Sequence, residues 1–145
     1  MKRFPHPLLA ALSLFAGVAQ ACEGLAASAA WVREPPPGSP ASAGFMRLSN
    51  HGAKPVTVTG WKAAGFGMTM LHETVLDGST ARMVMRESLA VAPGGTVELS
   101  PGGLHLMLMK PSAPVTAGNT VTLVLTCAGG TLAVEAPVRR AGEEP

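Results

Sequence analysis

The chain has 145 residues, of which 14% are charged and 4% aromatic, while 17 are glycine and 13 are proline. This length suits one domain with a real core rather than two domains, and the composition excludes a highly charged disordered chain. The formal net charge of +2 becomes zero without Lys2 and Arg3, which lie in a leader that we expect to be removed. The charge balance therefore gives no reason to expect binding to nucleic acid or to an anionic membrane surface.

Residues 1–21 have the pattern of a signal peptide. Two basic residues precede an apolar stretch, residues 8–18, which is too short to span a bilayer. Residues 19–21 read Ala-Gln-Ala, a small-x-small pattern that favours cleavage before Cys22. We therefore expect a periplasmic protein with no membrane span after the leader is removed. The alternative is a lipoprotein anchored through Cys22, which is disfavoured because Ala19 and Gln20 are poor lipobox residues.

The chain has two cysteines, Cys22 and Cys127. In an exported protein such a pair usually forms a disulfide, which here would join the first strand to one of the last. The alternative is that one cysteine binds a metal, and an oxidising compartment favours the disulfide.

From Gly24 onward the sequence is typical of short β-strands separated by Gly/Pro turns. The expected strands span residues 25–34, 44–50, 56–61, 68–75, 81–87, 96–100, 104–109, 120–127 and 131–138. A proline run at residues 35–37 begins a loop, and Asp77-Gly78 is typical of a hairpin turn. The pattern predicts an all-β sandwich or barrel forming one domain, residues 22–138, with a short polar tail at residues 139–145.

Six of the eight methionines and two of the four histidines lie between residues 68 and 109. Side chains two residues apart in a strand share a face. Three groups therefore each occupy one face of a strand: Met68, Met70 and His72; Met83 and Met85; His105, Met107 and Met109. We predict that the three strands are neighbours and present two imidazoles and two thioethers to one metal ion. Such soft, neutral donors favour Cu(I), whereas Mg²⁺ and Ca²⁺ prefer oxygen ligands, and zinc sites favour cysteine, histidine and carboxylate.

Strand spacing alone does not separate Met83 from Met85, or Met107 from Met109. Methionine is also a common core filler, which is the role that we expect for Met46. His51 lies in a turn signal and is expected to be solvated.

The spacing of the donors adds a resemblance. Ten residues separate His72 from Met83, and twenty-one separate Met83 from the segment His105-Leu106-Met107. This spacing resembles the H-x10-M-x21-H-x-M signature of the periplasmic copper chaperone family PCu(A)C. The Pro-Gly-Gly segments at residues 93–95 and 101–103 are similar too, and the similarity runs from about residue 30 to residue 138.

The resemblance implies a cupredoxin-like Greek-key β-barrel that is not an enzyme. It implies one Cu(I) bound by positions matching His72, Met83, His105 and Met107. It also implies delivery of copper to the CuA centre of cytochrome c oxidase or to related assembly factors, and we expect a monomer. Two departures are visible: Glu73 follows the first histidine where some members have methionine, and the tail lacks the His and Met residues of a second copper site.

The sequence disfavours two other functions and leaves a third open. A blue-copper electron carrier needs a Cys ligand with further ligands nearby, and no His or Met follows Cys127. A hydrolase is disfavoured, because we find no nucleophile-elbow pattern and no Ser/His/acid set. The alternative that stays open is a metal-free cell-envelope interaction or scaffold domain, in which the methionines only pack.

Overall fold

The computed structural model describes residues 22–145, so the predicted leader at residues 1–21 lies outside the described part of the chain. Within it, no helix is long and apolar enough to cross a membrane. Ten strands form the domain: β1 (Leu25–Arg33), β2 (Ala41–Asn50), β3 (Val56–Ala63), β4 (Phe66–Asp77), β5 (Thr80–Arg86), β6 (Leu89–Val91), β7 (Thr96–Leu99), β8 (Leu104–Pro111), β9 (Thr120–Cys127) and β10 (Gly130–Arg139).

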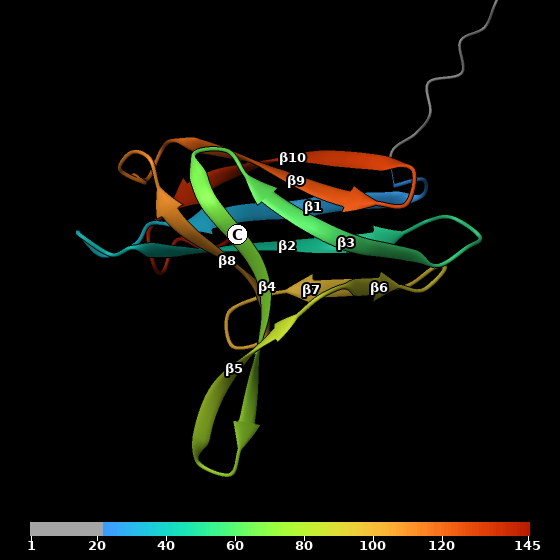
Figure 1. Cartoon of the computed structure of the whole chain (residues 1–145), viewed down its shortest axis with the longest axis horizontal. Coiled ribbons are helices and arrows are strands. Elements are labelled where there is room, and N and C mark those ends of the chain that lie inside the picture. The colour runs from blue at the N-terminus through green and yellow to red at the C-terminus, as the bar shows by residue number, and fades with distance from the viewer. Residues whose placement is uncertain (1–21) are drawn as a thin grey trace, which may run out of the picture.

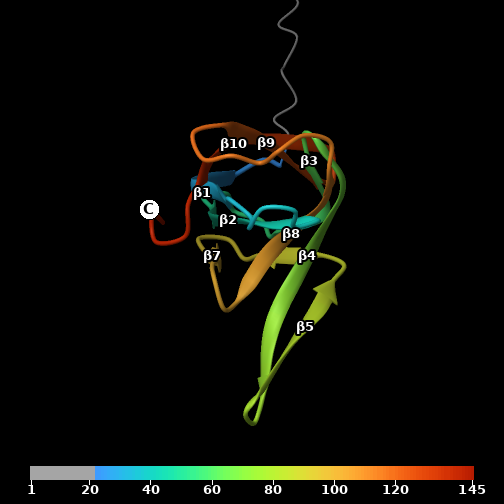
Figure 2. The same ribbon diagram turned by 90° about the vertical axis from the view of Figure 1, so that its left-hand side faces the viewer.

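The strands are hydrogen-bonded in the order β5-β4-β8-β7-β2-β1-β10-β9-β3-β6, with β8 also paired to β2. The sheet curls over on itself, so that β3, β9 and β10 lie over β1, β2 and β8 (Figure 2). The pairings are antiparallel except for β1 with β10 and β7 with β8. This all-β, barrel-like architecture confirms the predicted fold class.

The core fills the space between the two layers. On β9 alternate side chains are buried, ending with Leu123, Leu125 and Cys127, which is the period of two expected of a strand with one buried face. From the opposite layer, Leu106 and Leu108 of β8 are almost fully buried. Each such leucine stabilises the fold by roughly 1.5–3 kcal/mol relative to an exposed one.

The β4–β5 hairpin projects away from the barrel (Figure 1). Its turn contains Gly78, whose φ of 62° is the left-handed conformation that an Asp-Gly turn requires. Beyond the barrel β5 is a mostly exposed edge strand. The hairpin therefore carries its side chains at the surface.

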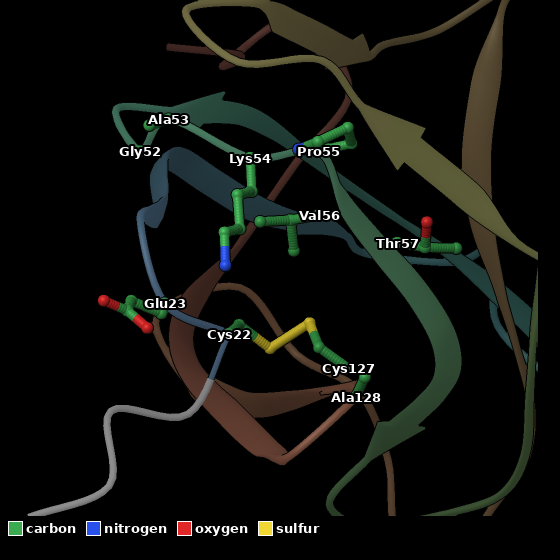
Figure 3. Close-up of a pocket in the computed structure, with 10 residues that line it drawn as sticks. All are labelled: Cys22, Glu23, Gly52, Ala53, Lys54, Pro55, Val56, Thr57, Cys127 and Ala128. Atoms are coloured by element: carbon green, nitrogen blue, oxygen red, sulfur yellow. A yellow bond between two sulfur atoms is a disulfide. The ribbon is translucent and has the colours of Figure 1, made fainter.

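Cys22 and Cys127 form a disulfide with a Cα–Cα distance of 5.3 Å, as predicted. Both sulfurs are used, so the alternative in which one cysteine binds a metal is wrong. The disulfide lines a cavity of about 320 Å³ together with Lys54 and Val56 (Figure 3). No histidine or methionine lines this cavity, which sets it apart from the donors described below.

Several strand bounds differ from the prediction. β2 begins at Ala41 rather than at residue 44, and β4 is longer at both ends. The three-residue strand β6 was not predicted, because so short a segment shows too little alternation to indicate a strand. Arg139 ends β10 rather than beginning the tail.

Candidate metal centre

The three strands that carry the histidines and methionines are neighbours, as predicted, and they lie in the order β5-β4-β8. Directly opposed residues of an antiparallel pair share a face. Between β4 and β8 the opposed pairs are His72 with His105, Met70 with Met107, and Met68 with Met109. Between β4 and β5, His72 lies opposite Met85, and Thr74 lies opposite Met83. We call this surface the soft-donor face: Met68, Met70, His72, Met83, Met85, His105, Met107 and Met109.

The other face of the same strands carries buried leucines and an ion pair instead of soft donors. Leu71 pairs with Leu106 across β4 and β8, and both are buried in the core. Further along β4, Glu73 binds Arg86 through an Nε–Oε2 hydrogen bond of 2.7 Å. Alternation along the strands thus keeps this ion pair away from the soft-donor face.

The two imidazoles lie close together, with ring centroids 6.0 Å apart and planes inclined by 27°. His105 is only 5% exposed, and its Nδ1 lies 3.0 Å from the carbonyl oxygen of Gly103. An Nδ1–H that donates to this carbonyl leaves the Nε2 lone pair free, which is how proteins usually orient a metal-binding histidine.

Both rings retain a buried nitrogen without a hydrogen-bond partner: Nε2 of His105 and Nδ1 of His72. An unpaired buried polar atom costs about 1–3 kcal/mol and is uncommon in folded proteins. Two of them on adjacent side chains are readily explained if a ligand binds there.

Burial lowers the pKa of His72 from its ordinary value of 6.5, and the neighbouring His105 lowers this pKa further. His72 is therefore neutral at neutral pH. A neutral imidazole keeps the lone pair that a metal needs, so no proton has to be displaced first.

The two thioethers of β5 are more open than the imidazoles. Met83 is 60% and Met85 55% exposed, whereas Met107 is half-buried. Met83, Met107 and His105 line one cavity of about 260 Å³. Met85 and His72 are not among its lining residues, although they face each other across β4 and β5.

Sequence reasoning missed three contributors to this region. The Gly103 carbonyl orients His105, and the Pro-Gly-Gly turn before β8 was the only sign of it. Phe45 and Arg33 also line the cavity, and the Arg33 guanidinium lies 5.2 Å from the Phe45 ring centroid. Both residues come from strands distant in the sequence, so no local motif could have indicated them.

Among residues 22–145, no group of three or more His, Cys, Asp and Glu side chains could hold a metal. A metal ion at the soft-donor face would therefore need thioether ligands beside the imidazoles. The residues present fit a soft monovalent ion better than zinc, calcium or magnesium.

Comparisons with known proteins agree with this architecture. Residues 25–138 match the family described as "Putative lipoprotein LpqE-like". The curated protein "Putative lipoprotein Lxx21020" of Leifsonia xyli subsp. xyli is 33% identical over 119 residues, which are 81% of this chain and 70% of that protein.

Solved structures show the same fold. The Cu(I) form of DR1885 from Deinococcus radiodurans is 32% identical, with a TM-score of 0.66 over 85% of this chain and 83% of that one. The copper-bound PCuAC domain from PmoF2 has a TM-score of 0.70 over 83% of this chain and 97% of that domain, at 21% identity. The fold is thus that of the PCuAC domains, as the resemblance implied, and the chain belongs to the LpqE-like family.

Proposed function

We propose that this protein is a periplasmic copper chaperone that binds one Cu(I) through His72, Met83, His105 and Met107. The observation that carries the proposal is the arrangement of His105, whose Nδ1 faces the Gly103 carbonyl while its buried Nε2 has no partner next to His72. Two similar solved structures add support, since one is the Cu(I) form of DR1885 and the other is the copper-bound PCuAC domain from PmoF2.

Met83 is favoured over Met85 because it lines the same cavity as His105 and Met107. Met85 remains the competing ligand, because it lies directly opposite His72. Met107 is favoured over Met109 for two reasons. It lines the cavity, whereas Met109 does not, and it is two residues nearer to His105 on the same face of β8.

Release of the ion follows from the same donor set. Two imidazoles and two thioethers are all neutral, so the bound ion keeps its single positive charge and no thiolate anchors it. Met83 is exposed on the projecting hairpin, where a partner's ligand can replace it. Copper then passes to the acceptor by stepwise ligand exchange. The acceptor in this proposal is the CuA centre of cytochrome c oxidase or a related assembly factor.

Binding is tested by titrating the reduced protein with Cu(I) in the presence of a chromophoric Cu(I) chelator. The parent should withdraw one equivalent of copper, and the His72→Ala/His105→Ala variant should withdraw far less at the same chelator concentration. His51→Ala is the matched control, because His51 is exposed in the loop between β2 and β3 and is not part of the soft-donor face. A double variant that titrates like the parent would place the site elsewhere. If the parent also takes up no copper, the metal-free scaffold function is favoured.

Delivery needs a separate experiment. The Cu(I)-loaded protein is mixed with a purified apo CuA domain, and the copper content of each protein is measured after separation. Copper should appear on the CuA domain. Retention of all copper by the chaperone would contradict delivery to this acceptor and leave the binding proposal intact.

The location of the protein is the last part of the proposal. The family description names lipoproteins, which fits an exported protein, but the Cys22 sulfur is in a disulfide and cannot carry a lipid thioether at the same time. We expect the intact mass of the exported protein to show the disulfide and no acyl chains. A mass increased by a diacylglyceryl group would overturn this assignment.

A further inference from the structure

Besides Met85, the competing ligand, three methionines of the soft-donor face have no part in the proposed site: Met68, Met70 and Met109. Met68 lies directly opposite Met109, and Met70 is two residues from Met68 on the same face of β4. Directly opposed residues have Cβ atoms about 4.5–5.5 Å apart. The unbranched methionine side chain has three rotatable bonds, so three such thioethers can converge on one ion.

Packing alone does not account for this group. Met68 is 41% exposed, and Met70 and Met109 are only half-buried, whereas Met46, a true core methionine, is 2% exposed. On the neighbouring strand β2, Ala41 lies opposite Met109 and Ala43 lies opposite Met107. Alanine is small, so these two neighbours cover little of the β8 methionines on that side.

We propose that Met68, Met70 and Met109 form a second, weaker site for a soft monovalent ion such as Cu(I) or Ag(I). Thioethers select this class of metal, and the absence of an imidazole makes the site weaker than one that contains His72 and His105. Met70 lies directly opposite Met107, so the two sites adjoin. Insofar as the protein is a chaperone, which is the function proposed above, the ion moves between the sites by ligand exchange with no change of oxidation state.

The test follows each thioether separately. The protein is prepared with ¹³C-methyl methionine and titrated with Ag(I), which does not undergo redox cycling, and the methyl resonances are recorded by NMR. The first equivalent should shift Met83 and Met107, and the second should shift Met68, Met70 and Met109. Met46 serves as an internal reference that should not move.

The variant Met68→Leu/Met109→Leu keeps the side-chain volume and removes two sulfurs. It should retain the first equivalent of Ag(I) and bind the second at least tenfold more weakly. The inference is wrong if the second equivalent leaves these three methyl resonances unshifted, or if the leucine variant binds it like the parent.

A further variant separates this inference from the proposed function. In His72→Ala/His105→Ala, the three thioethers should still bind one Ag(I), because neither imidazole belongs to this set. Shifts of Met68, Met70 and Met109 in that variant support the second site even if Cu(I) delivery is disproved. Loss of those shifts would mean that the three methionines do not form a site of their own.

Discussion

A single backbone carbonyl determines the orientation of the His105 ring and which of its nitrogens has a free lone pair. By accepting the Nδ1–H at 3.0 Å, Gly103 fixes the ring orientation and leaves Nε2 as the lone-pair nitrogen beside His72. Because the partner is main chain, no side-chain substitution nearby removes it directly. This hydrogen bond fixes the imidazole orientation in the metal-free protein, which would reduce the ordering that metal binding has to impose.

The choice between Met83 and Met85 is open to a residue-level test. Met83→Leu should weaken Cu(I) binding at least tenfold, about 1.4 kcal/mol, because it removes a ligand while nearly keeping the volume. Met85→Leu, its matched control on the same strand, should bind within a few-fold of the parent. Affinities come from competition with a chelator of known strength, and the reverse ranking would make Met85 the ligand.

The lowered pKa of His72 makes the apo protein sensitive to acid. Between the lowered folded pKa and the ordinary value of 6.5, the unfolded state binds more protons, so the free energy of unfolding rises with pH across this window. We expect the Tm of the apo protein to fall as the pH drops below 6.5. The fall should be smaller in His72→Gln and unchanged in His51→Gln. Parallel curves for the parent and His72→Gln would contradict the assignment.

For individual residues, the sequence predicted which donor side chains share a strand face, but it did not predict which other residues line the cavity around them. The two-residue period placed His72 with Met70 and His105 with Met107 on common faces, because strand geometry is local. It could not indicate Arg33 or Phe45, which join the cavity only after β1, β2 and β8 have come together.

The two faces of strand β8 have different roles. Leu106 and Leu108 anchor it in the core, while His105 and Met107 lie on the soft-donor face. Leu106→Ala should lower the free energy of unfolding by about 2–5 kcal/mol, through lost burial and the cavity left behind. The control Leu76→Ala, at a 75% exposed position on the hairpin, should change it by less than about 0.5 kcal/mol. Denaturant unfolding measures both, and equal losses would contradict the assigned burial.

Among the elements, strands with strong alternation and the β4–β5 hairpin were predicted well, whereas the register and the full strand order were not predicted. β9 matches its expected bounds, and the Asp77-Gly78 hairpin forms between β4 and β5. The register that sets His72 against His105 joins residues 33 positions apart, and the strand order depends on non-local packing that no local signal specifies. The short β6 was missed because three residues show too little alternation.

For the molecule as a whole, the disulfide joins cysteines 105 positions apart. Closing so large a loop restricts the unfolded chain, and removing such a bond typically costs 2–5 kcal/mol. Cys22→Ala/Cys127→Ala should therefore unfold at lower denaturant concentration and bind Cu(I) with unchanged affinity when folded, because the disulfide and the soft-donor face line different cavities. Loss of Cu(I) affinity in the folded variant would show that the two regions are coupled.

The central claim is that side chains from three strands hold one monovalent copper ion together. X-ray absorption of the protein loaded with one equivalent of Cu(I) tests it most directly, since the spectrum separates sulfur from nitrogen ligands. We expect two sulfur and two nitrogen ligands in the parent, and loss of the nitrogen ligands in His72→Ala/His105→Ala. A spectrum with no sulfur, or one that the double variant leaves unchanged, would contradict it.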